Sequence, residues 1–154
     1  MIKVIVAGAA GRMGCRLVSL VRDSTALTLA GALEGKGHHA LGEDAGEMAG
    51  AGHAGIPITD DLATLMERGD VVIDFSAPEA TLGHLRIVAQ HRRAMVIGTT
   101  GFSASELDEL KSLGRQVPCV LSPNMSVGVN LIYKVIGEMA KTLGEEYDIE
   151  VIEA

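Results

Sequence analysis

The chain has 154 residues, which is enough for one complete α/β domain with a buried core and too few for two domains of ordinary size. Hydrophobic residues make up 47% and charged residues 21%, which excludes general disorder, and no apolar run approaches the roughly 20 residues that span a bilayer. The net charge of −7 without a concentrated basic face argues against nucleic-acid binding, and two cysteines, Cys15 and Cys119, fit a reducing cytoplasm better than a disulfide framework. We therefore expect a cytoplasmic protein with no nucleic-acid partner and no membrane partner.

Short apolar segments rich in strand-forming residues alternate along the chain with stretches that can hold a helix. These segments are IKVIVAG (2–8), ALTLAGALE (26–34), DVVIDFS (70–76), AMVIGTT (94–100) and VPCVLSPN (117–124). The alternation predicts βαβ units, in which helices cover both faces of a parallel sheet. The expected fold class is therefore α/β with a doubly wound parallel sheet.

Two serines precede an acidic residue by three positions and mark expected helix starts. Ser76 precedes Pro78 and Glu79, and Ser103 precedes Glu106. Each pattern predicts an N-cap with its capping-box partner, and Pro78 falls where its missing N–H does no harm.

Two segments depart from the alternation. Residues 35–55 carry seven of the 19 glycines and no sustained period, so we expect a mobile loop. Residues 126–144 have apolar side chains at three- and four-residue steps, which predicts a long helix, and residues 147–154 alternate like a strand. That strand would need partners that the chain does not supply, so we expect it to begin a second, truncated domain.

The turn after the first apolar segment contains three glycines spaced three residues apart. Gly8 closes the segment, Gly11 falls where a helix would begin, and Gly14 falls one turn into that helix, where only a hydrogen in place of a side chain allows close packing on the strand. This order of strand, turn and helix brings backbone N–H groups and the positive end of a helix dipole to a pyrophosphate. The spacing alone is weak evidence, and an ordinary tight turn is the alternative.

The second apolar segment ends in Glu34, 20 residues after Gly14. A dinucleotide site places a carboxylate at this distance, where it accepts hydrogen bonds from ribose hydroxyls. The two features together predict a dinucleotide-binding domain of the Rossmann type, with an incidental surface glutamate as the alternative. Glu34 would repel a 2′-phosphate, whereas Lys36 could partly neutralise it, so we expect a modest preference for NADH with NADPH tolerated.

Side chains beside the glycine turn allow two interpretations each. Arg12 either reaches a phosphate or a ring, or is a solvated helix arginine, and for Arg16 the solvated role is favoured. Cys15 is interpreted as a small packing residue beside Gly14 rather than as a reactive thiol.

Three further loops fall at the carboxyl ends of predicted strands, where open α/β sheets bind their ligands. They are residues 74–77, GTTG at 98–101 and SPNMS at 122–126. The backbone of GTTG either lines the nicotinamide half of a cofactor or forms an ordinary turn. Asn124 is either an amide ligand or the N-cap of the following helix.

Five segments, in this order and spacing, resemble the N-terminal part of the bacterial 4-hydroxy-tetrahydrodipicolinate reductase family. They are VAGAAGRMG, DFSAPEATLGHL, MVIGTTGF, NMSVGVN and DIEVIEA, and together they span nearly the whole chain. The resemblance implies NADH- or NADPH-dependent reduction of a cyclic dicarboxylate in the diaminopimelate and lysine pathway. It also implies a cofactor domain at residues 1–126 and, at residues 127–154, a hinge helix and the first strand of a truncated α+β substrate domain. Members of the family form a homotetramer through that domain, which leaves open the state of this chain alone.

The resemblance further implies cofactor contacts in four segments. These are Gly8, Ala9, Ala10, Gly11, Arg12 and Met13; Glu34; Gly98, Thr99 and Thr100; and Pro123, Asn124, Met125 and Ser126. The residues by themselves point to the same loops, but they single out neither Met13 nor Met125.

The family's catalytic residues are expected beyond Ala154, where members continue with an H-H-R-x-K stretch and a P-S-G-T segment. The five histidines of this chain do not match that stretch and are interpreted as solvated or packed: His38, His39, His53, His84 and His91. No metal-ligand cluster and no Ser-His-Asp arrangement can be assembled either. We therefore expect this chain to bind a cofactor without catalysing the reduction.

Two other functions stay open. A stand-alone dinucleotide-binding redox regulator would need no catalytic residues, but it would be expected to carry a partner surface or a DNA-reading surface that the acidic chain lacks. Another amino-acid-pathway dehydrogenase could use the same cofactor domain, because fold does not fix chemistry.

Overall fold

The computed structural model describes residues 1–152 and divides the chain into two units, Met1–Leu121 and a second unit that begins at Ser122. This division does not test whether a cofactor domain extends to residue 126, which stays a prediction. Within the described residues, no helix combines the length and the hydropathy needed to cross a bilayer.

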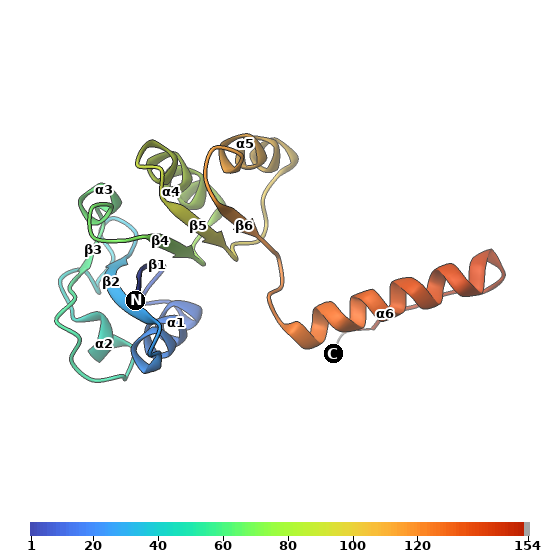
Figure 1. Cartoon of the computed structure of the whole chain (residues 1–154), viewed down its shortest axis with the longest axis horizontal. Helices are drawn as coiled ribbons and strands as arrows, with labels where there is room; N and C mark the ends of the chain where they lie inside the picture. Colours follow the sequence, from blue (N-terminus) through green and yellow to red (C-terminus); the bar gives the residue numbers. More distant parts are fainter. Residues whose placement is uncertain (153–154) are drawn as a thin grey trace. The chain divides into compact units, whose positions relative to one another are not determined.

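The first unit is built on one sheet of six parallel strands in the order β3-β2-β1-β4-β5-β6 (Figure 1). The strands are β1 (Ile2–Ala7), β2 (Leu27–Leu33), β3 (Ile58–Thr59), β4 (Val71–Asp74), β5 (Ala94–Ile97) and β6 (Cys119–Leu121). All were expected except β3, whose two residues are too few to form a pattern in the sequence. The strand order reverses between β1 and β4, and this is the point at which ligands bind in doubly wound sheets.

Helices cover both faces of this sheet, as the alternation predicts (Figure 1). They are α1 (Arg12–Asp23), α2 (Ala45–Met48), α3 (Leu62–Leu65), α4 (Pro78–Gln90) and α5 (Ala104–Gly114). On one face Val18 of α1 belongs to the same buried cluster as Val6 of β1, and on the other face Leu85 of α4 belongs to the cluster of Ile5. Strands covered on both faces need apolar side chains at successive positions, which explains the near-continuous apolar runs. The doubly wound α/β fold is therefore confirmed.

The two expected helix starts have different outcomes. Ser103 caps α5 with the predicted capping box, in which its hydroxyl accepts from the Glu106 amide at 3.3 Å and its own amide donates to the Glu106 carboxylate at 2.7 Å. The prediction for Ser76 is wrong, because Ala77 is the N-cap of α4 and, in the part of the chain that the structure describes, no side chain caps the N-terminus of this helix. The Ser76 hydroxyl instead donates to the buried carboxylate of Asp74 at 2.6 Å.

Residues 35–55 are not the featureless loop that their composition predicts, since they contain α2 and a set of turns around Asp44. One carboxylate oxygen of Asp44 accepts from the amides of Gly46, Glu47 and Ala54 at 2.8–3.1 Å, and the other accepts from the amide of Ile56 at 3.0 Å. Burial raises the pKa of Asp44, but hydrogen bonds from the amides of Ala54, Glu47 and Ile56 and the charge of the neighbouring His53 outweigh this effect and lower the pKa to about 2. The side chain of Asp44 thus closes a loop for which the sequence shows no sustained apolar period.

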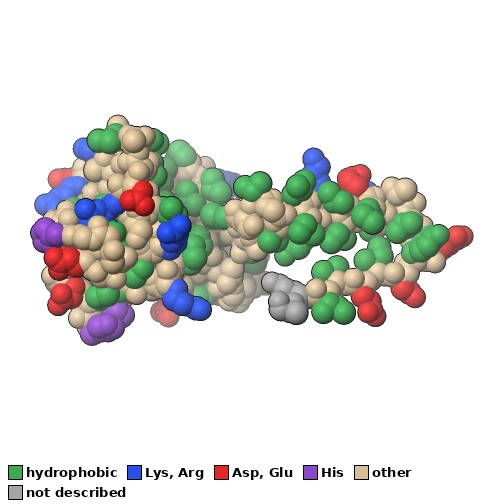
Figure 2. Space-filling model, turned by 90° about the horizontal axis from the view of Figure 1, so that it is seen from below, with side chains coloured by type: hydrophobic (Ala, Val, Ile, Leu, Met, Phe, Trp, Pro, Cys, Tyr) green, Lys and Arg blue, Asp and Glu red, His purple; other side chains and the backbone are tan. Residues whose placement is uncertain are grey.

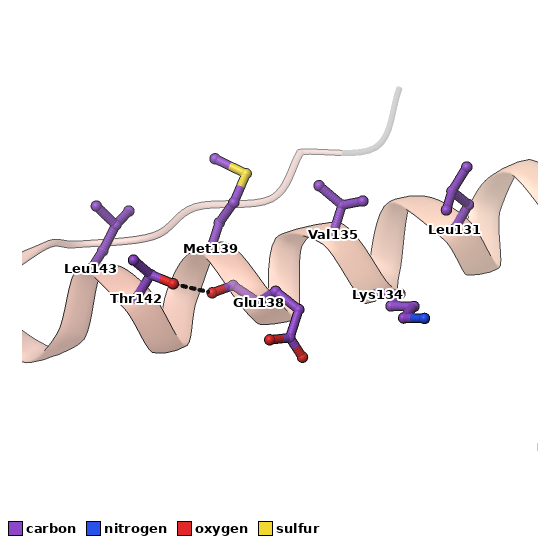
Figure 3. Close-up of a pocket in the computed structure, with 7 residues that line it drawn as sticks. All are labelled: Leu131, Lys134, Val135, Glu138, Met139, Thr142 and Leu143. Carbon is purple, nitrogen blue, oxygen red and sulfur yellow. Dashed lines mark hydrogen bonds between the residues drawn. The ribbon is translucent and has the colours of Figure 1, made fainter.

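The second unit contains α6 (Val127–Leu143), which confirms the predicted long helix, followed by a short 3-10 helix, η1 (Gly144–Glu146). Apolar side chains gather along α6 and along the chain that follows it (Figure 2). Leu131, Val135, Met139 and Leu143 line a hollow of about 470 Å³ on this helix (Figure 3). After η1 the chain turns back and runs beside α6 (Figures 1 and 3).

The strand expected from residue 147 onward does not form within the described residues. Residues 147–152 have no strand pairing, and residues 153–154 lie outside the described part. Alternation shows that a segment suits a sheet, but a strand exists only where a neighbour supplies the matching N–H and C=O groups.

Replacement of Gly14 by alanine should destabilise the first unit. A methyl group at this position would collide with the Gly8 carbonyl oxygen and lie 2.6 Å from the Ala9 Cα, so α1 would have to move. We expect a loss of about 1–3 kcal/mol in the free energy of unfolding, measured with denaturant. Gly83→Ala in α4 is the matched control, because open space surrounds it, and it should stabilise by about 0.5–1 kcal/mol. Equal stabilities of Gly14→Ala and wild type would contradict the packing described.

Asp44→Asn should lower the melting temperature in a pH-dependent way. Because folding lowers the pKa of Asp44 from 3.8 to about 2, its ionised form adds stability above pH 4 that is lost as the pH falls toward 2. The difference in melting temperature between wild type and variant should therefore be full at pH 6 and shrink between pH 4 and pH 2. Asp60→Asn, at an exposed position, should show no such convergence. A difference independent of pH would mean that the carboxylate charge has no role in closing the loop.

Candidate functional site

The turn between β1 and α1 brings the start of a helix against the end of a strand. Gly8 has a φ of +74°, a left-handed conformation that favours glycine, and Gly11 is the N-cap of α1. The Leu33 carbonyl at the end of β2 accepts from the amides of both Gly8 and Ala9, at 2.9 and 3.0 Å. These bonds hold the turn at the carboxyl end of the sheet, beside the strand-order reversal.

The first amides of α1 are available to an anion. Gly11 donates to the Gly8 carbonyl at 3.0 Å, so the turn uses its own donor there. The amides of Arg12 and Met13 have no acceptor within residues 1–152, and both residues are exposed. Two free N–H groups at the positive end of a 12-residue helix suit a phosphate or pyrophosphate group. The side chains of Arg12 and Arg16 are also exposed and form no ion pair in the described structure.

Glu34 lies directly against this turn. Its Oε1 accepts from the Ala10 amide at 2.8 Å, and its Oε2 accepts from its neighbour Gly35 at 3.2 Å. Each carboxylate oxygen has two lone pairs, so both keep acceptor capacity for a hydroxyl group. The acid that the spacing singled out is therefore part of the turn's own hydrogen bonding, and Lys36 beyond it is exposed.

Two adjoining hollows cross the site at the carboxyl edge of the sheet. The larger, about 390 Å³, is lined among others by Glu34 and His84, and the smaller, about 280 Å³, by Arg12 and Thr100. Both share Gly11, Phe75 and Ser76 as lining residues, so they meet above the start of α1. An elongated ligand with a charged middle fits this arrangement, since Arg12 and Met13, which carry the free amides, line the smaller hollow next to the Gly11 that both hollows share.

The loop after β5 forms the far wall of the smaller hollow. A methyl group on Gly98 would overlap the ring of Phe75, so glycine is required there, and the exposed Gly101 has a φ of +89°. Of the two threonines, Thr100 is exposed, whereas Thr99 is 4% exposed and its hydroxyl accepts from Thr81 at 2.8 Å. The loop therefore offers its backbone and one hydroxyl to the hollow.

A buried carboxylate with no role assigned from the sequence directly precedes Phe75 and Ser76, which line both hollows. Asp74, at the end of β4, is fully buried and accepts from the Ser76 amide at 2.9 Å and from His84 Nδ1 at 2.7 Å. Burial raises the pKa of Asp74, but the hydrogen bond and charge of His84 and the two donations from Ser76 outweigh it, so the pKa is lowered. The sequence pattern that could have indicated this cluster is an aspartate, Asp74, at the end of an apolar strand. Thr81 and His84 follow on one face of the next helix.

Residues 123–126 belong to the second unit and form the entrance to α6. Ser126 is the N-cap and accepts from the Val129 amide at 3.3 Å, so the alternative that Asn124 caps the helix is wrong. The Asn124 side chain accepts from the Ser126 amide at 2.8 Å, and its carbonyl accepts from Ser122 and Asn130. Within residues 1–152, neither Pro123 nor Met125 forms a side-chain hydrogen bond, and the role of all four residues in cofactor binding stays a prediction.

The other candidate chemistry does not assemble at this site. Within residues 1–152, no group of three or more His, Cys, Asp or Glu side chains is placed to hold a metal ion. Cys15 packs beside the glycine turn, with its thiol 3.5 Å from the Ala9 carbonyl. His53 lies beside Asp44 and Glu47, and His91, the C-cap residue of α4, contacts the carbonyl of Ile87 in that helix.

The family model and the relatives that match this chain point to the same reductase family. The family model described as "Dihydrodipicolinate reductase, N-terminus" matches residues 2–125. The 4-hydroxy-tetrahydrodipicolinate reductase of Syntrophus aciditrophicus (strain SB) is 47% identical over 99% of this chain and 57% of its own length. That of Syntrophobacter fumaroxidans is 45% identical over the whole chain and 58% of its own length. The chain thus spans a little over half the length of these relatives.

Solved structures agree with this assignment of fold. A dipicolinate-bound dihydrodipicolinate reductase from Paenisporosarcina sp. TG-14 superposes with a TM-score of 0.70 at 26% identity, covering 88% of this chain and 52% of that one. An amine dehydrogenase from Mycobacterium smegmatis, at 22% identity and a TM-score of 0.61, shares the fold over 78% of this chain.

Proposed function

Because the chain belongs to the dihydrodipicolinate reductase N-terminal family, we propose that residues 1–126 form the NAD(P)H-binding part of a reductase for 4-hydroxy-tetrahydrodipicolinate. The reaction would yield tetrahydrodipicolinate in the diaminopimelate and lysine pathway, in the cytoplasm. The observation that carries the proposal is the meeting of the glycine turn, Glu34 and the loop after β5 at one edge of the sheet.

Each part of the cofactor has chemically suitable residues in this arrangement. The amides of Arg12 and Met13 would bind the pyrophosphate, with the Arg12 guanidinium close enough along the helix to add charge. Glu34 would accept from the hydroxyls of the adenosine ribose, using the lone pairs that Ala10 and Gly35 leave free. The backbone of residues 98–100 would line the nicotinamide end, and residues 123–126 would complete that end.

The cofactor, when bound, supplies the hydride, and the residues of this chain hold it in position and exclude water. The relatives are nearly twice as long as this chain. We therefore assign substrate binding to the part of the relatives that this chain does not cover. We propose that this chain alone binds the cofactor without reducing the cyclic dicarboxylate. In this proposal, the complete enzyme forms the homotetramer.

The chain should bind NADH more tightly than NADPH by a modest factor, up to about tenfold. The Glu34 carboxylate would repel a 2′-phosphate, and the exposed Lys36 offsets only part of that repulsion. Calorimetric titration with each cofactor at the same ionic strength measures the ratio. A dissociation constant for NADPH ten or more times lower than that for NADH would overturn this assignment of Glu34.

Glu34→Ala should weaken NADH binding by about 10- to 150-fold, since it removes a charged acceptor worth roughly 1.5–3 kcal/mol. Glu34→Gln retains an acceptor for the Ala10 amide but not the charge, so it should raise NADPH affinity relative to NADH. Glu67→Ala, at an exposed position without a hydrogen bond, serves as the control in the same titrations. Unchanged NADH affinity in a folded Glu34→Ala would exclude a ribose contact.

A further inference from the structure

Asp74 and His84 form a hydrogen-bonded pair in which one ring nitrogen of the histidine, Nε2, stays available to a ligand. Asp74 is fully buried, and its Oδ1 is occupied by the amide and hydroxyl of Ser76 at 2.9 and 2.6 Å. Its Oδ2 faces His84 Nδ1 at 2.7 Å. His84 Nε2, by contrast, has no hydrogen-bond partner in residues 1–152, and the side chain keeps 19% of its surface exposed.

That exposed part of His84 faces a ligand hollow. The ring lines the larger of the two hollows, together with Glu34 and Ala80, and it does not line the smaller one. A histidine that served only to satisfy Asp74 would need no access to this hollow. Glu34, which we propose binds the adenosine ribose, lines the same hollow. The hollow is therefore assigned to the adenosine half of a dinucleotide.

The buried carboxylate also fixes which kind of group His84 offers. An ionised Asp74 can only accept, so in the neutral form of the ring Nδ1 carries the hydrogen and Nε2 is the acceptor. The same carboxylate network reaches Thr81 and Thr99, which hold α4 against the loop after β5. The ring is therefore fixed in both tautomer and orientation before a ligand arrives.

We propose that His84 Nε2 is a binding contact for the adenosine half of the cofactor, accepting a hydrogen bond from its ribose hydroxyl or its adenine amino group. Asp74 is the positioning residue that holds this nitrogen as an acceptor. The inference rests on the proposed function, since it concerns the same dinucleotide site. The hydroxyl and the amino group offer the same chemistry, a neutral donor, and the experiment separates them.

The test uses His84→Asn in the 154-residue chain. The asparagine amide can still donate to Asp74 in place of Nδ1, but nothing replaces Nε2. We expect the melting temperature to stay close to that of wild type while the dissociation constant for NADH rises about tenfold in calorimetry. Reduced nicotinamide hypoxanthine dinucleotide, which lacks the adenine amino group, locates the donor: a rise that persists assigns the hydroxyl, and a rise that disappears assigns the amino group.

A second measurement on the wild-type chain does not depend on any variant folding. Nitrogen-15 spectra of the imidazole should show a protonated Nδ1 and an unprotonated Nε2, with the Nε2 resonance moving on saturation with NADH. Wild-type binding of NADH with an unmoved Nε2 resonance, or with equal affinity in a folded His84→Asn, would overturn this inference alone. No binding of NADH by wild type would overturn the proposed function together with it.

Discussion

The close approach of α1 to the end of β1 is the contact on which the rest of the site depends. It exists because Gly14 has no side chain where the Gly8 carbonyl and Ala9 lie, and because Gly8 adopts a left-handed conformation just before it. With the helix in this position, α1 begins after the end of β1, beside the strand-order reversal, and the amides of Arg12 and Met13 have no acceptor within residues 1–152. A larger residue at position 14 would move the helix, and the anion site would move with it.

Hydrogen bonds to residues at the ends of neighbouring strands hold this turn in place and leave the two hollows open. Leu33 and Glu34, at the end of β2, accept from the amides of Gly8, Ala9 and Ala10, and so use the donors of the turn that precede α1. On the other side, Asp74 at the end of β4 holds α4 and the loop after β5. The ends of β2 and β4 thus supply the frame, and the donors left over are those that a pyrophosphate requires.

The features predicted correctly from sequence were those set by local patterns. Apolar runs predicted five strands, and the Ser103 capping box depends only on residues within one turn. Ser76 shows the limit of this reasoning: the same local pattern fails there because a buried carboxylate from the preceding strand competes for its hydroxyl. Asp44 and His84 could not be assigned from sequence, since their partners are chosen by tertiary contacts. Residues 147–152 alternate like a strand, but alternation cannot supply the partner that pairing requires.

The most direct test of the account is the amide chemical-shift map of the chain on addition of NADH. A dinucleotide bound at the start of α1 predicts the largest changes at residues 8–13, at Glu34 and at residues 98–100, which are distant in sequence and share only this edge of the sheet. Changes confined to α6, or no changes at millimolar NADH, would contradict the claim that the first unit is a cofactor-binding domain.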